Sequence, residues 1–108
     1  MKKSIMLAFM MILTFAFAGC EKLAETGSIE GRVIDKIDGS AIQNATVWTN
    51  PPTSRVLTDN DGRYYIDGVS PGDYTVYASA SGYHTDSVAV HVVEGNRTRA
   101  DFMLEPGP

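Results

Sequence analysis

The segment Asp59-Asn60-Asp61-Gly62 has side-chain oxygens at three consecutive positions, and this gives the sequence its strongest pattern for metal binding. Carboxylate and amide oxygens are the ligands that Ca²⁺ prefers, and calcium-binding loops can begin in this way. Such a loop also needs a bidentate glutamate at its twelfth position, and position twelve counted from Asp59 is Ser70. The alternative is a tight hairpin turn, in which the Asp and Asn side chains accept backbone N–H groups and Gly62 adopts a positive φ. The sequence therefore favours a turn without a metal, and Asp59 and Asp61 are the residues to test for calcium.

Catalytic residues are hard to assemble from the rest of the chain. The sequence contains no G-x-S-x-G, no H-E-x-x-H and no glycine-rich phosphate loop. His84 and His91 lie seven positions apart, with no cysteine or third histidine nearby. Lone histidines of this kind are typical of the protein surface. We therefore expect a protein that is not an enzyme and that uses no dissociable cofactor.

Three aromatic residues, Trp48, Tyr65 and Tyr77, are candidates for ligand contact. Each alternates with residues predicted to face the protein core, so their rings are expected to point away from it. Exposed aromatic rings on a sheet can stack on sugar rings, whereas scattered or loop-covered rings are ordinary surface features. These three residues are therefore the candidate contacts for a carbohydrate ligand.

The first twenty residues differ in composition from the remainder of the chain. Lys2 and Lys3 precede an apolar run over residues 5–18 in which Thr14 is the only polar residue. As a helix this run spans about 21 Å, which is shorter than the roughly 30 Å hydrocarbon core of a bilayer. A secretory signal therefore explains the run better than a membrane-spanning helix does.

The segment Phe17-Ala18-Gly19-Cys20 resembles the lipobox of bacterial lipoproteins. This resemblance implies that signal peptidase II removes residues 1–19 and that Cys20 carries covalent lipid, including palmitate. Residues 20–26 then form the lipidated cysteine and a polar tether, and residues 27–108 form the folded domain. An ordinary signal peptide or a retained anchor with an unrelated free cysteine is the alternative. Because Cys20 is the only cysteine, a disulfide framework is excluded.

Charge limits the partners of the chain. The full sequence has 9 basic and 13 acidic residues, a net charge of 9 − 13 = −4, and removal of Lys2 and Lys3 leaves 7 − 13 = −6. An acidic chain without a run of Lys and Arg argues against nucleic acid as a partner, and an anionic lipid surface would repel it. Membrane attachment must then come from acyl chains on Cys20. Residue 21 is Glu rather than the Asp that resembles an inner-membrane retention signal, so we expect the outer membrane of a bacterial cell envelope.

From Gly27 onward the apolar residues alternate with polar ones, as they do in half-buried strands. Turn residues such as Asp38-Gly39, Pro71-Gly72 and Ser81-Gly82 separate the alternating segments. Six or seven short strands at this spacing are typical of an antiparallel β-sandwich. The predicted core comprises Ile29, Val33, Val47, Ile66, Tyr74, Val76, Val88, Val90, Phe102 and Leu104.

The order of several short motifs resembles the carboxypeptidase regulatory-like domain family over about residues 27–105. The resemblance implies an all-β fold, a seven-stranded antiparallel Greek-key sandwich of the transthyretin (prealbumin) type. Members of the family are usually accessory modules beside peptidases, at receptor N-termini or in cell-surface proteins. The motifs are GRVID (31–35), NATV (44–47), TDNDGRY (58–64), GV (68–69), PGDYTV (71–76), GY (82–83) and DF (101–102) with Leu104.

Three functions are compatible with these observations. The first is a non-enzymatic, lipid-anchored module of the cell envelope that contacts an unknown envelope protein or supports assembly. The second is a carbohydrate-binding module that contacts a polysaccharide through Trp48, Tyr65 and Tyr77. The third is a hydrolase related to transthyretin-like enzymes, which the sequence supports least because no histidine-based site is evident.

Overall fold

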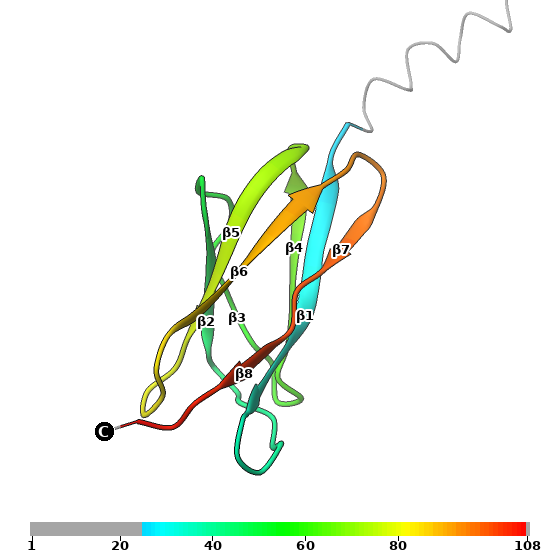
Figure 1. The fold of residues 1–108 in the computed structure, drawn as a ribbon. Helices are drawn as coiled ribbons and strands as arrows, with labels where there is room; N and C mark the ends of the chain where they lie inside the picture. The colour runs from blue at the N-terminus through cyan, green and yellow to red at the C-terminus, as the bar shows by residue number, and fades with distance from the viewer. Residues whose placement is uncertain (1–24, 108) are drawn as a thin grey trace, which may run out of the picture.

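The computed structural model describes residues 25–107, which form two facing β-sheets (Figure 1). The predicted signal peptide at 1–19, the lipid site at Cys20 and most of the predicted tether lie outside the described residues. No helix within the described range is long and apolar enough to cross a membrane. The strands are β1 (Gly27–Asp35), β2 (Thr46–Asn50), β3 (Val56–Leu57), β4 (Arg63–Val69), β5 (Gly72–Ser79), β6 (Asp86–Val92), β7 (Arg97–Arg99) and β8 (Phe102–Leu104).

Each sheet has four strands, and the strands of one sheet are not all consecutive in the chain. The first sheet has the order β4-β1-β7, and β8 also pairs with β1; the second has the order β3-β2-β5-β6. The chain thus crosses between sheets after β1, β3, β4 and β6. This arrangement confirms the predicted all-β sandwich of the prealbumin-like class.

One pairing differs from the prediction of antiparallel strands throughout, because β1 pairs with β7 and β8 in parallel. The cause is the loop after β6, which returns to the first sheet at the end where β1 begins. There the Gly95 N–H donates to the Thr26 carbonyl, and the Ser28 N–H donates to the Asn96 carbonyl. The last strand therefore starts beside the first one and runs in the same direction. Turn chemistry in the sequence does not indicate at which end a chain re-enters a sheet.

Strands β7 and β8 are two parts of one interrupted strand. Between them the Ala100 N–H still donates to the Glu30 carbonyl at 2.9 Å. The Arg32 N–H instead donates to the Asp101 side chain, Oδ1, at 2.9 Å. A carboxylate thus replaces a backbone carbonyl for one step of the ladder, and β8 resumes the pairing at Val33. Counted as one strand, they give the seven strands predicted.

The core lies between the sheets and agrees with the predicted set in most positions. Seven of the ten predicted core residues are buried: Ile29, Val33, Val47, Ile66, Val76, Phe102 and Leu104. The other three, Tyr74, Val88 and Val90, are only partly buried and pack against the core. Val88 and Val90 belong to β6, which is the outer strand of its sheet and leaves one flank open to solvent.

Tyr64 is a buried residue of β4 whose side chain extends across β1 to Ala100. It lies opposite Gly31 in the β1–β4 pairing, and its hydroxyl donates to the Ala100 carbonyl at the β7–β8 interruption. A Cβ on Gly31 would lie 1.9 Å from that carbonyl oxygen and 3.0 Å from Cε2 of Tyr64. Burial raises the pKa of the Tyr64 hydroxyl, with a smaller contribution from Asp101. Gly31 is therefore required for space, because both β7 and the Tyr64 ring approach its backbone.

Candidate functional site

Two of the three candidate aromatics form a row across the outer face of the second sheet. Trp48 of β2 and Tyr77 of β5 are cross-strand partners, and their rings stack with centroids 5.3 Å apart and an interplanar angle of 10°. The Arg55 guanidinium lies 5.1 Å from the centroid of the Trp48 ring. Because β2 lies between β3 and β5, Arg55 and Tyr77 lie on opposite sides of the indole.

This row limits how the two aromatic rings can contact a ligand. A sugar stacks on the face of an aromatic ring, and both faces of Trp48 already have a neighbour in Arg55 and Tyr77. The second face of Tyr77 is directed toward Ser87, its small cross-strand partner on β6. Only Tyr77 therefore offers a ring face for stacking, and the row is better described as a stacked, cation-capped surface.

Tyr65, the third candidate, lies on the opposite side of the sandwich. It belongs to β4, its side chain is 49% exposed, and it is the cross-strand partner of Glu30 on β1. The structure therefore brings Trp48 and Tyr77 together but separates both from Tyr65, so the three residues do not form one contact surface. Alternation predicted that the rings point outward, but it could not indicate which sheet carries each strand.

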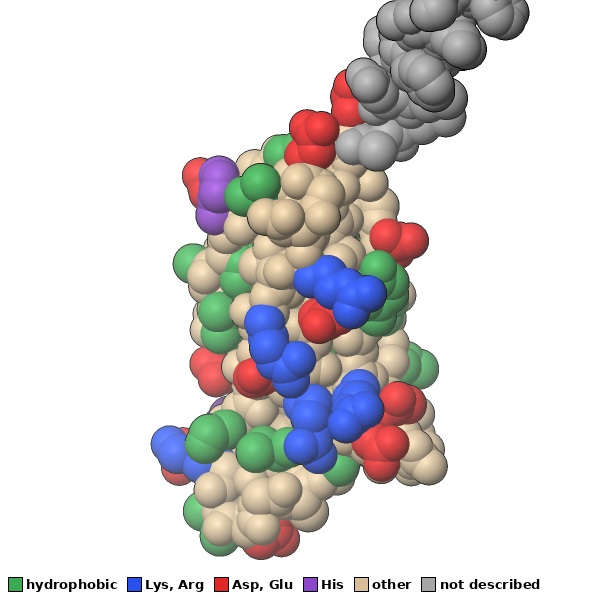
Figure 2. Space-filling view, turned by 90° about the vertical axis from the view of Figure 1, so that its right-hand side faces the viewer, with side chains coloured by type: hydrophobic (Ala, Val, Ile, Leu, Met, Phe, Trp, Pro, Cys, Tyr) green, Lys and Arg blue, Asp and Glu red, His purple; other side chains and the backbone are tan. Residues whose placement is uncertain are grey.

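The outer face of the first sheet carries the main concentration of positive charge. Figure 2 shows Lys and Arg side chains gathered on one face of the molecule. Arg32 of β1, Arg63 of β4, and Arg97 and Arg99 of β7 project from the outer face of the first sheet, called here the arginine face. These are four of the six basic residues in the described chain, which also has twelve acidic residues. This cluster is not evident in the sequence because the four arginines are dispersed over 68 positions and meet only through strand pairing.

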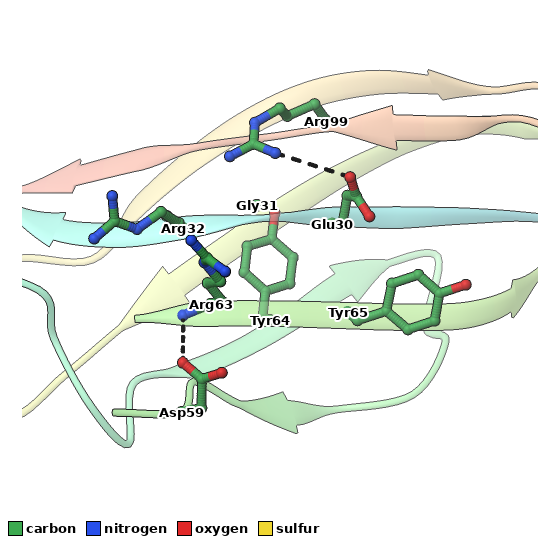
Figure 3. A pocket seen from close by; sticks show the side chains of 8 residues that line it. All are labelled: Glu30, Gly31, Arg32, Asp59, Arg63, Tyr64, Tyr65 and Arg99. Atoms are coloured by element: carbon green, nitrogen blue, oxygen red, sulfur yellow. Dashed lines mark hydrogen bonds and ion pairs between the residues drawn. The ribbon is translucent and has the colours of Figure 1, made fainter. Parts of the chain in front are cut away.

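A hollow of about 370 Å³ lies within the arginine face (Figure 3). Arg32 and Arg63 lie at one end of it and Tyr65 at the other. Between them, the Glu30 carboxylate forms ion pairs with Arg97 at 3.7 Å and with Arg99 at 3.8 Å. Arg99 also forms an ion pair with Asp101 at 3.0 Å. The lining residues are Glu30, Gly31, Arg32, Asp59, Arg63, Tyr64, Tyr65 and Arg99.

The predicted turn at residues 59–62 is present and uses its acidic side chain locally. Oδ1 of Asp59 accepts the N–H groups of Asp61 and Arg63, each at 2.9 Å, and Gly62 has φ 77°. These hydrogen bonds, first that from Arg63 and then that from Asp61, lower the pKa of Asp59. Within residues 25–107 no group of three or more His, Cys, Asp or Glu side chains is placed to hold a metal ion.

We expect calcium to leave the stability of this turn unchanged. Because the Asp59 carboxylate already accepts two backbone N–H groups, a bound ion would have to compete with them. Addition of about 5 mM CaCl₂ should therefore not raise the melting temperature of the chain lacking residues 1–24, measured by circular dichroism. Asp59→Ala should lower that temperature equally with calcium and with EDTA. A calcium-dependent rise that Asp59→Ala abolishes would instead identify the turn as a metal site.

The two histidines do not meet. His91, near the end of β6, pairs with Asp73 at 2.7 Å on an exposed surface. His84 lies in the loop before the other end of β6, and its ring lies close to the backbone of Gly107. The sequence predicted two lone histidines at the surface. In the structure they lie near opposite ends of β6.

A buried carboxylate at the far end of β1 is a polar centre that the sequence analysis missed. Asp35 is only 8% exposed, and its Oδ2 accepts the Tyr83 hydroxyl at 2.7 Å. Its Oδ1 accepts the N–H groups of Ile37 at 2.7 Å and Asp38 at 3.1 Å. The Tyr83 hydrogen bond lowers the pKa of Asp35 most, against the effect of burial, and Asp35 in turn raises the pKa of Tyr83. This contact joins the loop after β1 to the loop before β6.

The lowered pKa of Asp35 predicts an acid-dependent loss of stability. A carboxyl group with a depressed folded pKa stabilises the fold above its unfolded pKa, about 3.9, and this contribution disappears as the pH falls through the folded pKa. Asp35→Asn should therefore lower the melting temperature at pH 7 and have a smaller effect at pH 3. Thermal unfolding of both proteins at the two pH values measures this. Tyr83→Phe should weaken the pH dependence, and a pH-independent difference for Asp35→Asn would contradict the assignment.

Family comparison agrees with this geometry. The carboxypeptidase regulatory-like domain family matches residues 28–105. The match covers nearly all of the described sandwich, and the chain therefore belongs to that family, as the sequence motifs indicated. Human carboxypeptidase D is 35% identical over 79 residues, which is 72% of this chain and 6% of that protein. The chain thus spans only about 6% of the length of the curated relatives it matches.

Solved structures with the same fold belong to proteins of different kinds. The minor pilin GBS52 of Streptococcus agalactiae superposes with a TM-score of 0.61 at 16% identity, covering 78% of this chain and 46% of the pilin. The 5-hydroxyisourate hydrolase of Klebsiella pneumoniae superposes with a TM-score of 0.59 at 15% identity, covering 75% of this chain and 92% of the hydrolase. At these identities the likeness establishes the β-sandwich and nothing about activity.

Proposed function

We propose that the protein is a non-enzymatic, lipid-anchored module of the bacterial cell envelope that contacts another envelope protein. The anchor is the lipid expected on Cys20, and the contact module is the sandwich of residues 27–108. The lipobox-like sequence supports the anchor, and the Glu at position 21 favours the outer membrane. Membership of a family of accessory domains supports the non-enzymatic role.

The observation that carries the proposal is the composition of the outer face of the first sheet. It combines several arginines with Tyr65, which is 49% exposed, and Met103, which is 52% exposed. Arg, Tyr and Met are enriched in protein–protein interfaces relative to the rest of protein surfaces. The pilin superposition adds a precedent for this fold within an assembly protein.

Carbohydrate binding is the second candidate, and the Trp48–Tyr77 pair is the observation in its favour. Aromatic pairs on a sheet are suitable for stacking on sugar rings, but Arg55 and Tyr77 cover the two faces of Trp48. Tyr65 lies on the other sheet and cannot contribute to the same contact. A hydrolase activity remains the third candidate, for which the hydrolase superposition supplies only a common fold.

Cross-linking in cells distinguishes these functions. The full chain with a C-terminal affinity tag is cross-linked with formaldehyde and purified from the envelope, and the same protein is applied to a glycan array. We expect a small set of discrete cross-linked envelope proteins and no saturable glycan signal. A saturable glycan signal that Tyr77→Ala removes, without any cross-linked protein, would contradict the proposal and support carbohydrate binding.

A further inference from the structure

Two arginines on the arginine face lie side by side, and neither forms an ion pair within 4.0 Å among residues 25–107. Arg32 of β1 and Arg63 of β4 are direct cross-strand partners, a position in which like charges repel. Among residues 25–107, the carboxylates that lie within 4.0 Å of arginines pair with Arg97 and Arg99 and not with these two. The Arg32 side chain donates from Nε to the Asp61 carbonyl at 3.2 Å, which leaves its two terminal amino groups available.

Nearby acidic residues are committed to other contacts. Asp59 lines the same hollow, but its Oδ1 accepts the backbone N–H groups of Arg63 and Asp61, and it forms no ion pair within 4.0 Å in the described chain. These hydrogen bonds lower the pKa of Asp59 most, and attraction by the Arg63 charge adds a smaller contribution. Asp101 accepts the Arg32 backbone N–H and the Arg99 side chain. The Arg32–Arg63 pair therefore retains guanidinium N–H groups that can donate to an external anion. Guanidinium groups bind carboxylates through two parallel hydrogen bonds, so a carboxylate placed between the two arginines would offset their repulsion.

An apolar hollow adjoins this pair and indicates the class of ligand. It has a volume of about 310 Å³ and shares Arg32 and Arg99 with the first hollow. Its apolar wall is formed by Ile34 and Met103, which are partners in the parallel β1–β8 pairing. A protein segment can supply a carboxylate and an apolar side chain at adjacent positions. An acidic polysaccharide supplies carboxylates but no apolar side chain, so the combination favours a protein.

We propose that the arginine face binds an acidic segment of a partner protein. A carboxylate of the segment lies between Arg32 and Arg63, and a neighbouring apolar side chain packs against Ile34 and Met103. The net acidic charge of the rest of the described chain confines such a segment to this face. The inference rests on the proposed function and specifies the chemistry of the partner.

Selection from a random peptide library displayed on phage tests this inference on the full chain in detergent. The most enriched peptide is then synthesised, and its dissociation constant is measured by fluorescence anisotropy. Four proteins are compared: the unmodified chain, Arg32→Gln/Arg63→Gln, Arg63→Gln and Arg55→Gln. Arg55→Gln is the matched control for Arg63→Gln, because it removes one exposed positive charge from beside Trp48 on the other sheet. Polygalacturonate and inorganic phosphate serve as competitors, and circular dichroism checks that each variant is folded.

We expect the enriched peptides to contain Asp or Glu beside an apolar residue. The dissociation constant should rise about tenfold or more in Arg32→Gln/Arg63→Gln and change less than about twofold in the matched control, because two charge-assisted contacts are lost only in the former. Met103→Ser should weaken binding by a smaller factor. If the double variant does not fold, Arg63→Gln alone decides, because Arg63 is exposed.

Other outcomes would overturn the inference. Enrichment of peptides without acidic residues, or equal weakening in Arg63→Gln and Arg55→Gln, would exclude the arginine pair as the docking site. Arginine-dependent binding of polygalacturonate without binding of acidic peptides would identify a polysaccharide site, and binding of phosphate alone would identify a small-anion site. If cross-linking in cells still yields partners with Arg32→Gln/Arg63→Gln, the proposed function stands and only this surface is wrong.

Discussion

Gly31→Ala is expected to lower the melting temperature of the domain by about 12 °C or more. The added methyl group would lie 1.9 Å from the Ala100 carbonyl oxygen and 2.7 Å from the carbonyl carbon, both backbone atoms. Relief requires moving β1 away from β7, and overpacking of this kind costs about 3 kcal/mol. In a domain of this size about 1 kcal/mol corresponds to 4–8 °C. Thermal unfolding of the chain lacking residues 1–24, followed by circular dichroism, measures the shift.

Two further variants separate the steric effect from other causes. Gly39→Ala adds the same methyl group where no atom lies within 4 Å, although φ is 75°. It should cost only about 1 kcal/mol, from backbone strain. Tyr64→Phe keeps the ring but leaves the Ala100 carbonyl without its donor, and should cost about 1–3 kcal/mol. A melting temperature for Gly31→Ala no lower than that of Gly39→Ala would contradict the close approach of β1 and β7.

Cys20→Ser is expected to abolish both lipidation and removal of residues 1–19. Because Cys20 is the only cysteine, its thiol is the only possible site of thioether-linked lipid. The variant should accumulate with residues 1–19 still attached and should incorporate no labelled palmitate. Immunoblotting and palmitate labelling of cells that produce each full-length protein measure both effects. Equal labelling of the two proteins would show that the lipobox interpretation is wrong.

Glu21→Asp is the matched control for this experiment. The change keeps Cys20 and the charge at position 21, so processing and palmitate labelling should be unaffected. If the outer membrane is the destination, the variant should move to the inner-membrane fraction on a density gradient. Retention of both proteins in the inner membrane would contradict the outer-membrane assignment but leave the lipid anchor unaffected.

Local patterns in the sequence were sufficient for most strands, the 59–62 turn and most of the core, but they did not identify the short strands β3 and β7. Alternation identified Ile29, Val33 and Ile66 as inward-facing because that pattern depends only on neighbouring residues. Relations between distant strands were not accessible in the same way. Asp35 and Tyr83, which are 48 positions apart, belong to separate motifs, and nothing in either motif predicted that they share a hydrogen bond.

The surface features depended even more strongly on strand pairing. Trp48, Tyr65 and Tyr77 all alternate correctly, yet the order of strands places Tyr65 on the other side of the sandwich. The absence of a run of adjacent Lys and Arg residues did not exclude a basic cluster that forms through strand pairing. Arg32, Arg63 and Arg99 became neighbours through the antiparallel β1–β4 and parallel β1–β7 pairings. The functional surface was therefore the least predictable part of the molecule.

The parallel pairing of β1 with β7 and β8 has a consequence for the timing of folding. On one side, β1 pairs with β7 and β8, whose residues are synthesised last, and Phe102 and Leu104 of the core come from β8. Loop-closure entropy must be overcome before these distant contacts form, so a nascent chain that ends before Phe102 cannot complete the sandwich. The lipoprotein proposed above would be exported as an unfolded chain. Its topology would keep it competent for translocation until the final residues have emerged.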